Sequence, residues 1–598
     1  MVNNNTVLFV FLFFCPLNFI FAQPDSLRED ASDSIFINSI ETLLEQNETE
    51  ENDSPLLELL TDSAIKNETA RTSLHLRSRL QEEMQQRKGF LNGDYKGSRL
   101  KSYQRIAGTY DNFSAGVLFD KDAGELQLND FSTGYFRAKN IVDSISFLVG
   151  DYVVESGEGL ILWRGFDVGK GANVLSPAHR NGRGIVPHLS SDEVYFFRGS
   201  AVTFQFSPVT FSLFFSQRKR DATIDTATHT ATFYSAGYFR TENELTKRNT
   251  LPEKTFGGIA GYSMTKNISF GASFYRSQFD YTLLIREGNI FSGKNLSLGS
   301  LFFDAKFSTI KLFGEAAQSS TRASGKILGG QFFPARNFTF ITVWRNYDER
   351  FFSLHGLGFG ERTETSNERG IYFGVSLRPA RRVNLALYYD QFAFPQPTNT
   401  IFNHRGNEVL CRAEFQQSPQ LYFVLQTQKK ENVVQRRFFY HNEWYVQDVF
   451  QSKYQVRFIV DARTVNGFSF RERIDFVTVK QDYRSQRNNG ILLYGDIGKK
   501  LSEKISGTFR FVIFNTDSYE SRVSEFEKDL TGALSIPSLY GKGIRWYIFV
   551  EWEIAENVML QWKYSSTYRD DIKIIGTGNN AFPANTISAL GMQLEWRL

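Results

Sequence analysis

The side chains with the clearest potential for chemistry lie between residues 120 and 193. Asp120, Asp122 and Glu125 set three carboxylates at the spacing of half a calcium-binding loop. A full EF-hand loop draws its oxygen ligands from a longer run with a glycine at its centre, and that run is absent here. We therefore interpret this stretch as a charged hairpin loop.

Residues 165–171 (GFDVGKG) combine glycines with a lysine, as phosphate-binding loops do. They lack the four-residue spacer and the Ser or Thr that follows the lysine. The seven histidines show no HExxH or paired metal-ligand spacing, and no Gly-x-Ser-x-Gly elbow occurs. These patterns predict no catalytic residue, no cofactor, no metal and no enzyme. A membrane-embedded hydrolase with a dispersed Ser, His and acid set stays open as a minor alternative.

The elements that would hold these residues are predicted from side-chain alternation. In residues 589–598 (ALGMQLEWRL), apolar and polar side chains alternate without a break. Leu590, Met592, Leu594, Trp596 and Leu598 share one face, and Gly591, Gln593, Glu595 and Arg597 share the other. Such a strand has one apolar wall and one polar wall. The alternation returns in segments of about ten residues along most of the chain, the length of a tilted membrane-crossing strand. An edge strand of a soluble sheet would not explain this repetition.

The connections between these segments differ in length in an ordered way. Short connections fall at 265–267, 308–309, 334–336, 379–381, 418–419, 502–504 and 555–557. Long polar connections fall near 278–297, 346–369, 393–406, 430–450, 517–541 and 567–584. Outer-membrane barrels have short periplasmic turns and long outer loops, so this sorting is typical of them. The alternation fails between about 207 and 255, and 319–323 is short where a long loop is due.

Composition fits the same class. The chain has 598 residues, of which 41% are hydrophobic and 15% aromatic, with a net charge of +3. A barrel wall needs apolar residues only at every second position, so the mean hydropathy of −0.32 is compatible with a membrane protein. The balanced charge points to no particular partner. Only Cys411 would remain in the mature chain, so no internal disulfide is expected.

The first hundred residues differ from the rest of the chain. Residues 7–22 form an apolar run typical of a secretory signal, which predicts a signal peptide over 1–22 with cleavage at Ala22-Gln23. Residues 23–98 hold few aromatics and place Leu74, Leu76, Leu80 and Met84 in a pattern read as helical. We expect a short α-helical periplasmic segment there. The predicted all-β fold is then a large transmembrane antiparallel β-barrel over 99–598, with roughly 24 strands, an even number as bacterial barrels have.

One long segment of the barrel region fits no wall strand. Residues 155–192 are rich in glycine, do not alternate, and exceed the usual length of a structureless loop. Large barrels are often plugged, so we predict that this segment folds into the lumen. Its candidate luminal side chains are Glu158, Trp163, Arg164, Asp167, Lys170, His179, Arg180, Arg183 and His188.

A set of short motifs resembles a known family. The motif residues are Asp120, Asp122, Glu125, Gly150, Asp151, Asp192, Glu193, Arg198, Arg240 and Glu242. Together they resemble a family of outer-membrane barrel proteins that carry periplasmic helix-hairpin-helix repeats of the competence type. The resemblance covers roughly residues 35–265 and implies an outer-membrane barrel. Residues 30–88 contain no glycine, so the hairpins that would meet DNA phosphates are missing. Nucleic-acid binding is therefore not carried over.

These observations predict a protein of the outer membrane of a Gram-negative cell. The leading hypothesis is a channel or transport component of unknown substrate. The alternative is a non-catalytic scaffold or surface-binding protein, linked to uptake of macromolecules such as DNA. Expected partners are outer-membrane lipid and the barrel-assembly machinery during insertion, and a periplasmic partner bound through residues 23–98 stays open.

Overall fold

The computed structural model describes residues 72–142, 144–164, 169–285, 290–362, 364–395, 404–440, 443–483 and 487–598. The predicted signal peptide and residues 23–71 of the predicted periplasmic segment lie outside these residues.

Twenty-four antiparallel strands of the described chain form one closed wall. They are β1 (Thr72–Glu83), β2 (Lys101–Tyr110), β3 (Phe113–Lys121), β4 (Phe131–Val142), β5 (Ile145–Glu155), β7 (Phe197–Phe206), β8 (Val209–Arg220), β11 (Leu251–Thr265), β12 (Ile268–Ile285), β13 (Phe291–Phe307), β14 (Ile310–Ser319), β15 (Ser324–Ala335), β16 (Phe338–Tyr347), β17 (Glu368–Ala380), β18 (Val383–Phe394), β19 (His404–Ser418), β20 (Leu421–Tyr440), β21 (Glu443–Arg463), β22 (Phe468–Gln481), β23 (Asn488–Lys500), β24 (Ile505–Thr516), β27 (Lys542–Ala555), β28 (Val558–Arg569) and β29 (Thr586–Arg597). The predicted barrel and its strand number are confirmed.

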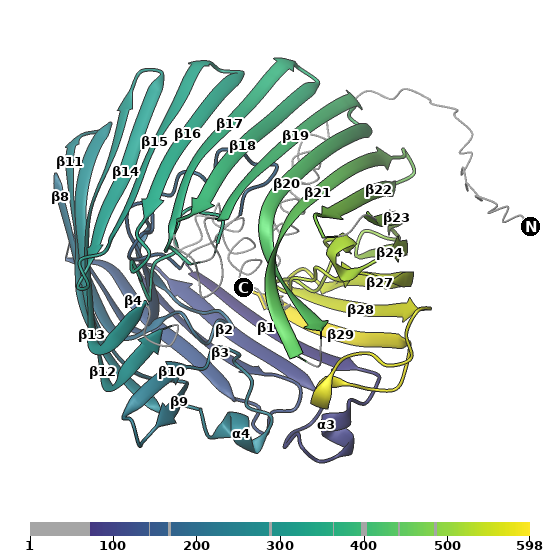
Figure 1. Cartoon of the computed structure of the whole chain (residues 1–598), viewed down its shortest axis with the longest axis horizontal. Helices are drawn as coiled ribbons and strands as arrows, with labels where there is room; N and C mark the ends of the chain where they lie inside the picture. Colours follow the sequence, from purple (N-terminus) through teal and green to yellow (C-terminus); the bar gives the residue numbers. More distant parts are fainter. Residues whose placement is uncertain are drawn as a thin grey trace, which may run out of the picture.

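The wall closes between its first and last strands. Strand β1 pairs with β2 on one side and with β29 on the other, with Arg77 opposite Glu595 in the register. Figure 1 shows the yellow β29 lying beside the purple β1, so the sheet has no free lateral edge. Lipid cannot satisfy open backbone groups, which is why a membrane-spanning sheet must close in this way.

Smaller elements belong to the connections. Strand β6 (Gly184–Pro187) pairs with β5, β9 (Ala222–Asp225) pairs with β10 (Thr230–Phe233), and β25 (Val523–Ser524) pairs with β26 (Ser538–Leu539). The helical turns are α3 (Lys88–Leu91), α4 (Glu242–Leu245), η2 (Tyr519–Ser521) and η3 (Gly578–Asn580). No helix within the described ranges is both long and apolar enough to cross a membrane. The β9–β10 hairpin, in which β10 pairs in parallel with the end of β12, adds two short strands between β8 and β11 and explains why the predicted strand order failed between 207 and 255.

Side chains alternate between an apolar outer face and a buried inner face. On β29, Met592 and Leu594 are exposed, whereas Gln593 and Glu595 are each 1% exposed, as the alternation predicted. Phe270 and Phe274 on β12 and Trp344 on β16 belong to the same outer face. A closed wall with a continuous apolar outer face is an outer-membrane β-barrel.

Connections differ between the two ends of the barrel. At one end, here called the short-turn end, β11–β12, β13–β14, β17–β18 and β27–β28 are each joined by two residues. The opposite, loop end carries residues 84–100, 156–196, 221–250, 348–367, 517–541 and 570–585. Two predicted long loops were wrong: strands β12 and β13 extend to residues 285 and 291, and β20 and β21 extend to 440 and 443. Strands β12 and β13 continue past the ends of β11 and β14, and Leu283 and Phe291 in these extensions are buried in the apolar core of the lumen.

The helical prediction for the end of the N-terminal segment is also wrong. Thr72–Glu83 is the wall strand β1, so the barrel begins before residue 99. Leu76 and Leu80 lie four residues apart, which fits a helix, but they also share the outer face of a strand with Leu74. The inward Arg77 and Arg79 between them are almost fully buried. Residues 88–91 alone form a helical turn, α3, in the described part of this segment.

Candidate functional site: the lumen and the connections packed inside it

Three connections from the loop end contact the inward-facing side chains of the wall. They are residues 156–196 (the insert), residues 348–367 and residues 517–541 (the acidic connection). Their contacts involve strands distant in sequence, such as Glu315 on β14 with Leu160 of the insert and Arg510 on β24 with Glu525 of the acidic connection. The chemistry of the lumen therefore depends on how these three segments bind to the wall.

The insert enters the lumen alongside residues 348–367. The Leu160 amide donates to Glu315 Oε2 at 3.0 Å, and Ser156 Oγ lies 3.0 Å from Ser273 Oγ on β12. The Trp163 amide donates to the carbonyl of His355 at 2.7 Å, which joins the two connections by a backbone contact. Leu160, Ile161 and Leu162 are fully buried.

Lys170 fixes the middle of the insert to the wall. Its Nζ lies 2.8 Å from Asp390 Oδ2 on β18 and 3.1 Å from Glu408 Oε2 on β19, and it also contacts Glu361 of residues 348–367. Arg345 on β16 adds a second cation, because it binds Asp390 through both terminal nitrogens at 2.8 and 2.9 Å. All five side chains are nearly or fully buried, and buried charges persist only when they are paired.

The tip of the insert reaches the short-turn end. The Val174 carbonyl accepts a hydrogen bond from Tyr372 on β17 at 2.9 Å, and His179 Nε2 lies 3.0 Å from Asp304 Oδ2, near the end of β13. Residues 172–175 border a cavity of about 360 Å³ with Arg336 and Arg378 at this end. The insert therefore extends through the barrel from the loop end.

The other predicted luminal residues make contacts within the insert, with the end of β5 and with residues 348–367. The Arg180 amide donates to Glu158 Oε2 at 2.9 Å, and the Arg180 guanidinium lies over the Trp163 ring. Two further contacts hold the ends of the insert. Arg183 binds Glu155 through two nitrogens, and His188 Nε2 lies 3.0 Å from the Asp192 carbonyl oxygen. Arg164 donates to the Leu354 carbonyl at 2.8 Å. Asp167 lies outside the described residues.

An apolar core fills the part of the lumen that the insert occupies. From the insert it contains residues 160–162, Val174 and Ala178. These pack against inward side chains from β12 to β19, including Phe279, Ile341 and Tyr388, and against Phe351 and Leu354 of residues 348–367. Continuous burial of this kind is the main stabilising contribution to a packed core. This side of the lumen is therefore held by apolar packing as well as by ion pairs.

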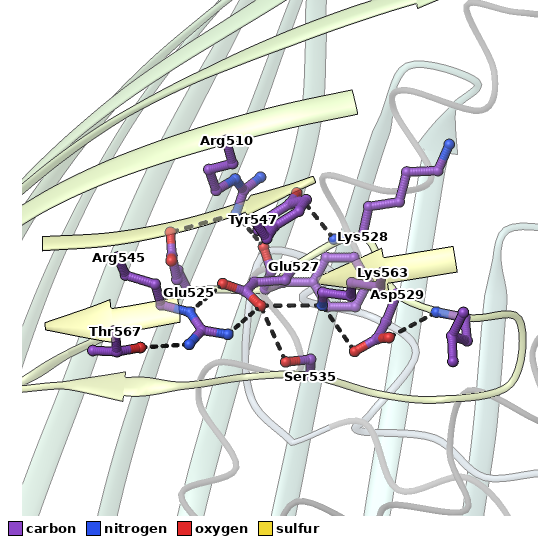
Figure 2. A network of polar contacts seen from close by, with 12 residues as sticks. Arg510, Glu525, Glu527, Lys528, Asp529, Ser535, Arg545, Tyr547, Lys563 and Thr567 are labelled. Atoms are coloured by element: carbon purple, nitrogen blue, oxygen red, sulfur yellow. Dashed lines mark hydrogen bonds and ion pairs between the residues drawn. The ribbon is translucent and has the colours of Figure 1, made fainter. Parts of the chain in front are cut away.

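The acidic connection binds its side of the lumen mainly through charge. Figure 2 shows Glu527 between two wall cations, Arg545 and Lys563. Arg545 Nε lies 2.5 Å from Glu527 Oε1, and Lys563 Nζ lies 3.1 Å from Glu527 Oε2 and 2.9 Å from Asp529 Oδ2. Glu525 lies 3.4 Å from Arg510. Two smaller apolar clusters add to this charge pairing. Val523 and Leu539 pack with inward side chains of β22 to β24, and Leu530 packs with Tyr547 and Phe549.

A cavity of about 300 Å³ lies between the acidic connection and the wall. Its charged lining consists of Arg79 and Glu83 on β1, Arg545 on β27, Lys563 on β28 and Asp529. Its other lining residues include hydroxyl side chains and Ser191 from the end of the insert. Arg79, Glu83 and Arg545 lie in the halves of their strands nearer the loop end and Lys563 lies at the middle of β28, so the cavity belongs to the outer part of the lumen.

The residues of the family-like motifs hold the loop-end rim between β3 and β8. Arg198 binds Asp151 at 2.7 and 2.8 Å, and Glu125 accepts from the amides of Asp122 and Phe239. Five further contacts fix the neighbouring turns. Asp192 accepts from the amides of Val194 and Tyr195, Lys96 binds Glu242, Arg240 binds Glu244, and Asp120 accepts from the Lys121 amide. Gly150 has φ +104°, and a Cβ there would lie 2.2 Å from the Gly134 oxygen.

Acidic residues at this rim are mutually close and poorly solvated. Burial, together with Asp130 and Asp122, raises the pKa of Glu125 to about 7. Burial and the neighbouring Glu125 raise the pKa of Glu193 to about 10. Within the described ranges, no group of three or more His, Cys, Asp or Glu side chains is arranged to hold a metal ion. The contacts of these motif residues hold the strands and turns of the rim together, which is a structural role.

The partners of Lys170 and the whole acidic connection were not among the predicted site residues. Residues 517–541 were predicted only as a long outer loop. A signal was available in residues 525–529 (EFEKD), whose carboxylates alternate as in a strand, and in the inward cations of 509–511 (FRF) and 562–564 (WKY). A lumen-facing cation between lipid-facing aromatics needs an anionic partner.

Comparisons with known proteins give distant structural matches. No family model and no curated protein sequence matches this chain. The chain is similar to the copper transporter OprC over 89% of its own length and 84% of that chain, at 7% identity and a TM-score of 0.46. It is similar to the siderophore receptor PirA from Acinetobacter baumannii over 89% and 81%, at 7% identity and a TM-score of 0.42. It is similar to OccAB3 from Acinetobacter baumannii over 88% of its own length and 99% of that chain, at 10% identity and a TM-score of 0.27. The barrel assignment rests on the strand pairing and apolar outer face of this chain.

Proposed function

We propose that this protein is a gated transport component of the outer membrane, whose pathway is closed by its own outer connections. One observation carries the proposal: residues 517–541 bind inside a wide barrel through ion pairs with inward wall cations. A wall of 24 strands encloses enough space for a pathway or a plug. A purely structural barrel has no need for a connection folded into its centre.

The two sides of the lumen differ in how readily they could open. On the insert side, opening would expose the apolar core to water, and the exposure of each large side chain costs about 1.5–3 kcal/mol. On the other side, the acidic connection buries only a few apolar side chains, Val523, Leu530 and Leu539, and its carboxylates are held by charged contacts that water or another anion can replace. We therefore assign the gate to residues 517–541 and a fixed plug to the insert.

Conductance in planar bilayers tests this proposal. The wild-type protein should show small or infrequent steps, and a variant with residues 519–539 replaced by a short Gly-Ser linker should show large, stable steps. A matched variant that shortens the rim connection 570–585, which contributes no residue to the apolar core of the lumen, should behave as the wild type. Silence of the variant with residues 519–539 replaced, in protein that migrates as a folded barrel, would contradict a transport role.

The scaffold alternative is favoured by one observation, the family-like motifs that brace the loop-end rim. A kinship with barrels that carry helix-hairpin-helix repeats belongs to this alternative. It predicts silent bilayers together with a partner that co-purifies after mild detergent extraction. No enzymatic activity is proposed.

A further inference from the structure

The acidic connection presents its carboxylates to the wall as an extended peptide would. Glu525, Glu527 and Asp529 are spaced at i, i+2 and i+4, and all three face wall cations. Two residues of extended chain span about 6.6–6.8 Å, so the wall binds a row of negative groups at that spacing. Figure 2 shows this row meeting Arg510, Arg545 and Lys563.

The three cations depend on the connection to different degrees. Arg510 also binds Asp496 on β23 at 2.5 and 2.6 Å, so it remains paired without the connection. Arg545 would keep only the Thr567 hydroxyl as a polar partner among the described residues. Lys563 has no carboxylate partner in the described chain besides Glu527 and Asp529. Withdrawal of the connection would therefore leave two cations facing the lumen without an anion.

The same two cations line the outer cavity. Arg545, Lys563 and Arg79 border its volume of about 300 Å³, which lies at the lower end of the range for small-molecule sites. Hydroxyl groups of Ser535, Ser565 and Ser588 supply further polar contacts. A solute in this cavity could reach the cations before the connection has fully withdrawn.

We propose that Arg545 and Lys563 form the binding site for an acidic solute that carries carboxylates at peptide-like spacing, and that Glu527 and Asp529 occupy this site at rest. The carboxylates of the solute would replace those of Glu527 and Asp529 on the two cations. Because this replacement releases the connection from the wall, binding of the solute would open the gate. Arginine suits this role because its planar fork matches a carboxylate, and Lys563 adds a point charge. This inference rests on the proposed transport function and adds a substrate class and a trigger to it.

Peptide binding to the full-length protein in detergent tests the inference. The probe is a dye-labelled acetylated peptide with the sequence EFEKD, followed by anisotropy, and the matched control is QFQKN. We expect the acidic peptide to bind at least tenfold more tightly than the control. Glu527→Gln combined with Asp529→Asn should tighten acidic-peptide binding at least tenfold, because the internal competitor is weakened. Citrate and inorganic phosphate, used as unlabelled competitors, distinguish a carboxylate preference from a general anion site.

Cation variants complete the experiment. Arg545→Gln with Lys563→Gln should weaken acidic-peptide binding at least tenfold, whereas Arg471→Gln, an inward cation paired with Asp461 near the short-turn end, should stay within twofold of the wild type. If the double cation variant does not fold as a barrel, the tightening in the Glu527 and Asp529 variant still decides. Equal binding of both peptides, or no change in either double variant, would overturn the inference.

The two proposals can fail separately. Peptide binding with silent bilayers, even after replacement of residues 519–539, would retain the anion site and refute transport. Large conductance steps in that replacement variant with no charge-dependent peptide binding would retain the channel and refute the acidic substrate class.

Discussion

Loss of the Lys170 ammonium should release the insert from the wall. In Lys170→Met, Asp390, Glu408 and Glu361 lose a shared buried cation. Removal of one partner from a buried ion pair usually costs about 3–5 kcal/mol. Here the cost should be about 3 kcal/mol, at the lower end of that range. Asp390 keeps Arg345, and Lys430 remains 2.6 Å from Glu361 and 3.7 Å from Glu408.

Hydrogen exchange measures this release directly. A loss of about 3 kcal/mol corresponds to roughly a hundredfold faster local opening, since each 1.4 kcal/mol is a factor of ten. Peptides from residues 169–180 should lose that protection, whereas peptides from 517–541 should not change. Lys429→Met is the matched control, because it removes a partly exposed pair with Glu431, and exposed pairs are worth about 0–1 kcal/mol.

A second variant checks the electrostatic cause. The cluster holds the cations Lys170, Arg345 and Lys430 and the carboxylates of Glu361, Glu368, Asp390 and Glu408. Glu408→Gln added to Lys170→Met restores the original charge difference and should recover part of the protection. Unchanged exchange in Lys170→Met, or an equal rise in residues 517–541, would refute the assignment of Lys170 as the anchor of the insert.

Three further predictions concern the rim and the wall. The raised pKa of Glu125 favours its neutral form in the folded protein, so its contribution to stability is present below about pH 4.5 and is lost as the pH rises through about 7. Glu125→Gln should therefore flatten the decrease in thermal stability between about pH 5 and 8. An unchanged slope would contradict the raised pKa. Cys411, exposed on the outer face of β19, should react in liposomes with an apolar maleimide and resist a charged one, and equal labelling by both would place it outside the lipid. Met592→Lys near the middle of β29 should lower the free energy of unfolding, measured in urea, by about 2–4 kcal/mol, because the lysine would face the centre of the bilayer. Leu598→Lys at the rim should cost about 0–1 kcal/mol. Equal effects of the two substitutions would contradict the membrane position of β29.

The sequence predicted the wall well because one physical rule governs it. Met592 and Gln593 must face lipid and lumen respectively, and that requirement is visible in the alternation itself. The rule failed at Thr72–Glu83, where Leu76 and Leu80 fit both a strand and a helix. The feature that decides for the strand, the burial of Arg77 and Arg79 on its inner face, is visible only in the structure.

The contents of the lumen were less predictable. Glycine content and length marked the insert, but they did not indicate that Lys170 meets Asp390, which is 220 residues away in the chain. Such contacts are set by the curvature and register of the whole barrel, and local sequence carries no record of them. The acidic connection did carry a signal, the alternating carboxylates of residues 525–529, but its pairing with Arg545 and Lys563 is set by the register of the barrel.

The seam between β1 and β29 has a consequence for assembly. Arg77 and Glu595 are separated by 518 positions, so their contact closes a very long loop. The chain entropy of such a closure is on the order of 5–6 kcal/mol, and it must be met at the last step. Until then the growing sheet has two edge strands with unpaired backbone groups, and each can pair with a wrong strand. Biogenesis of this protein should therefore depend on a catalyst that shields the first strand while the remaining strands are laid down.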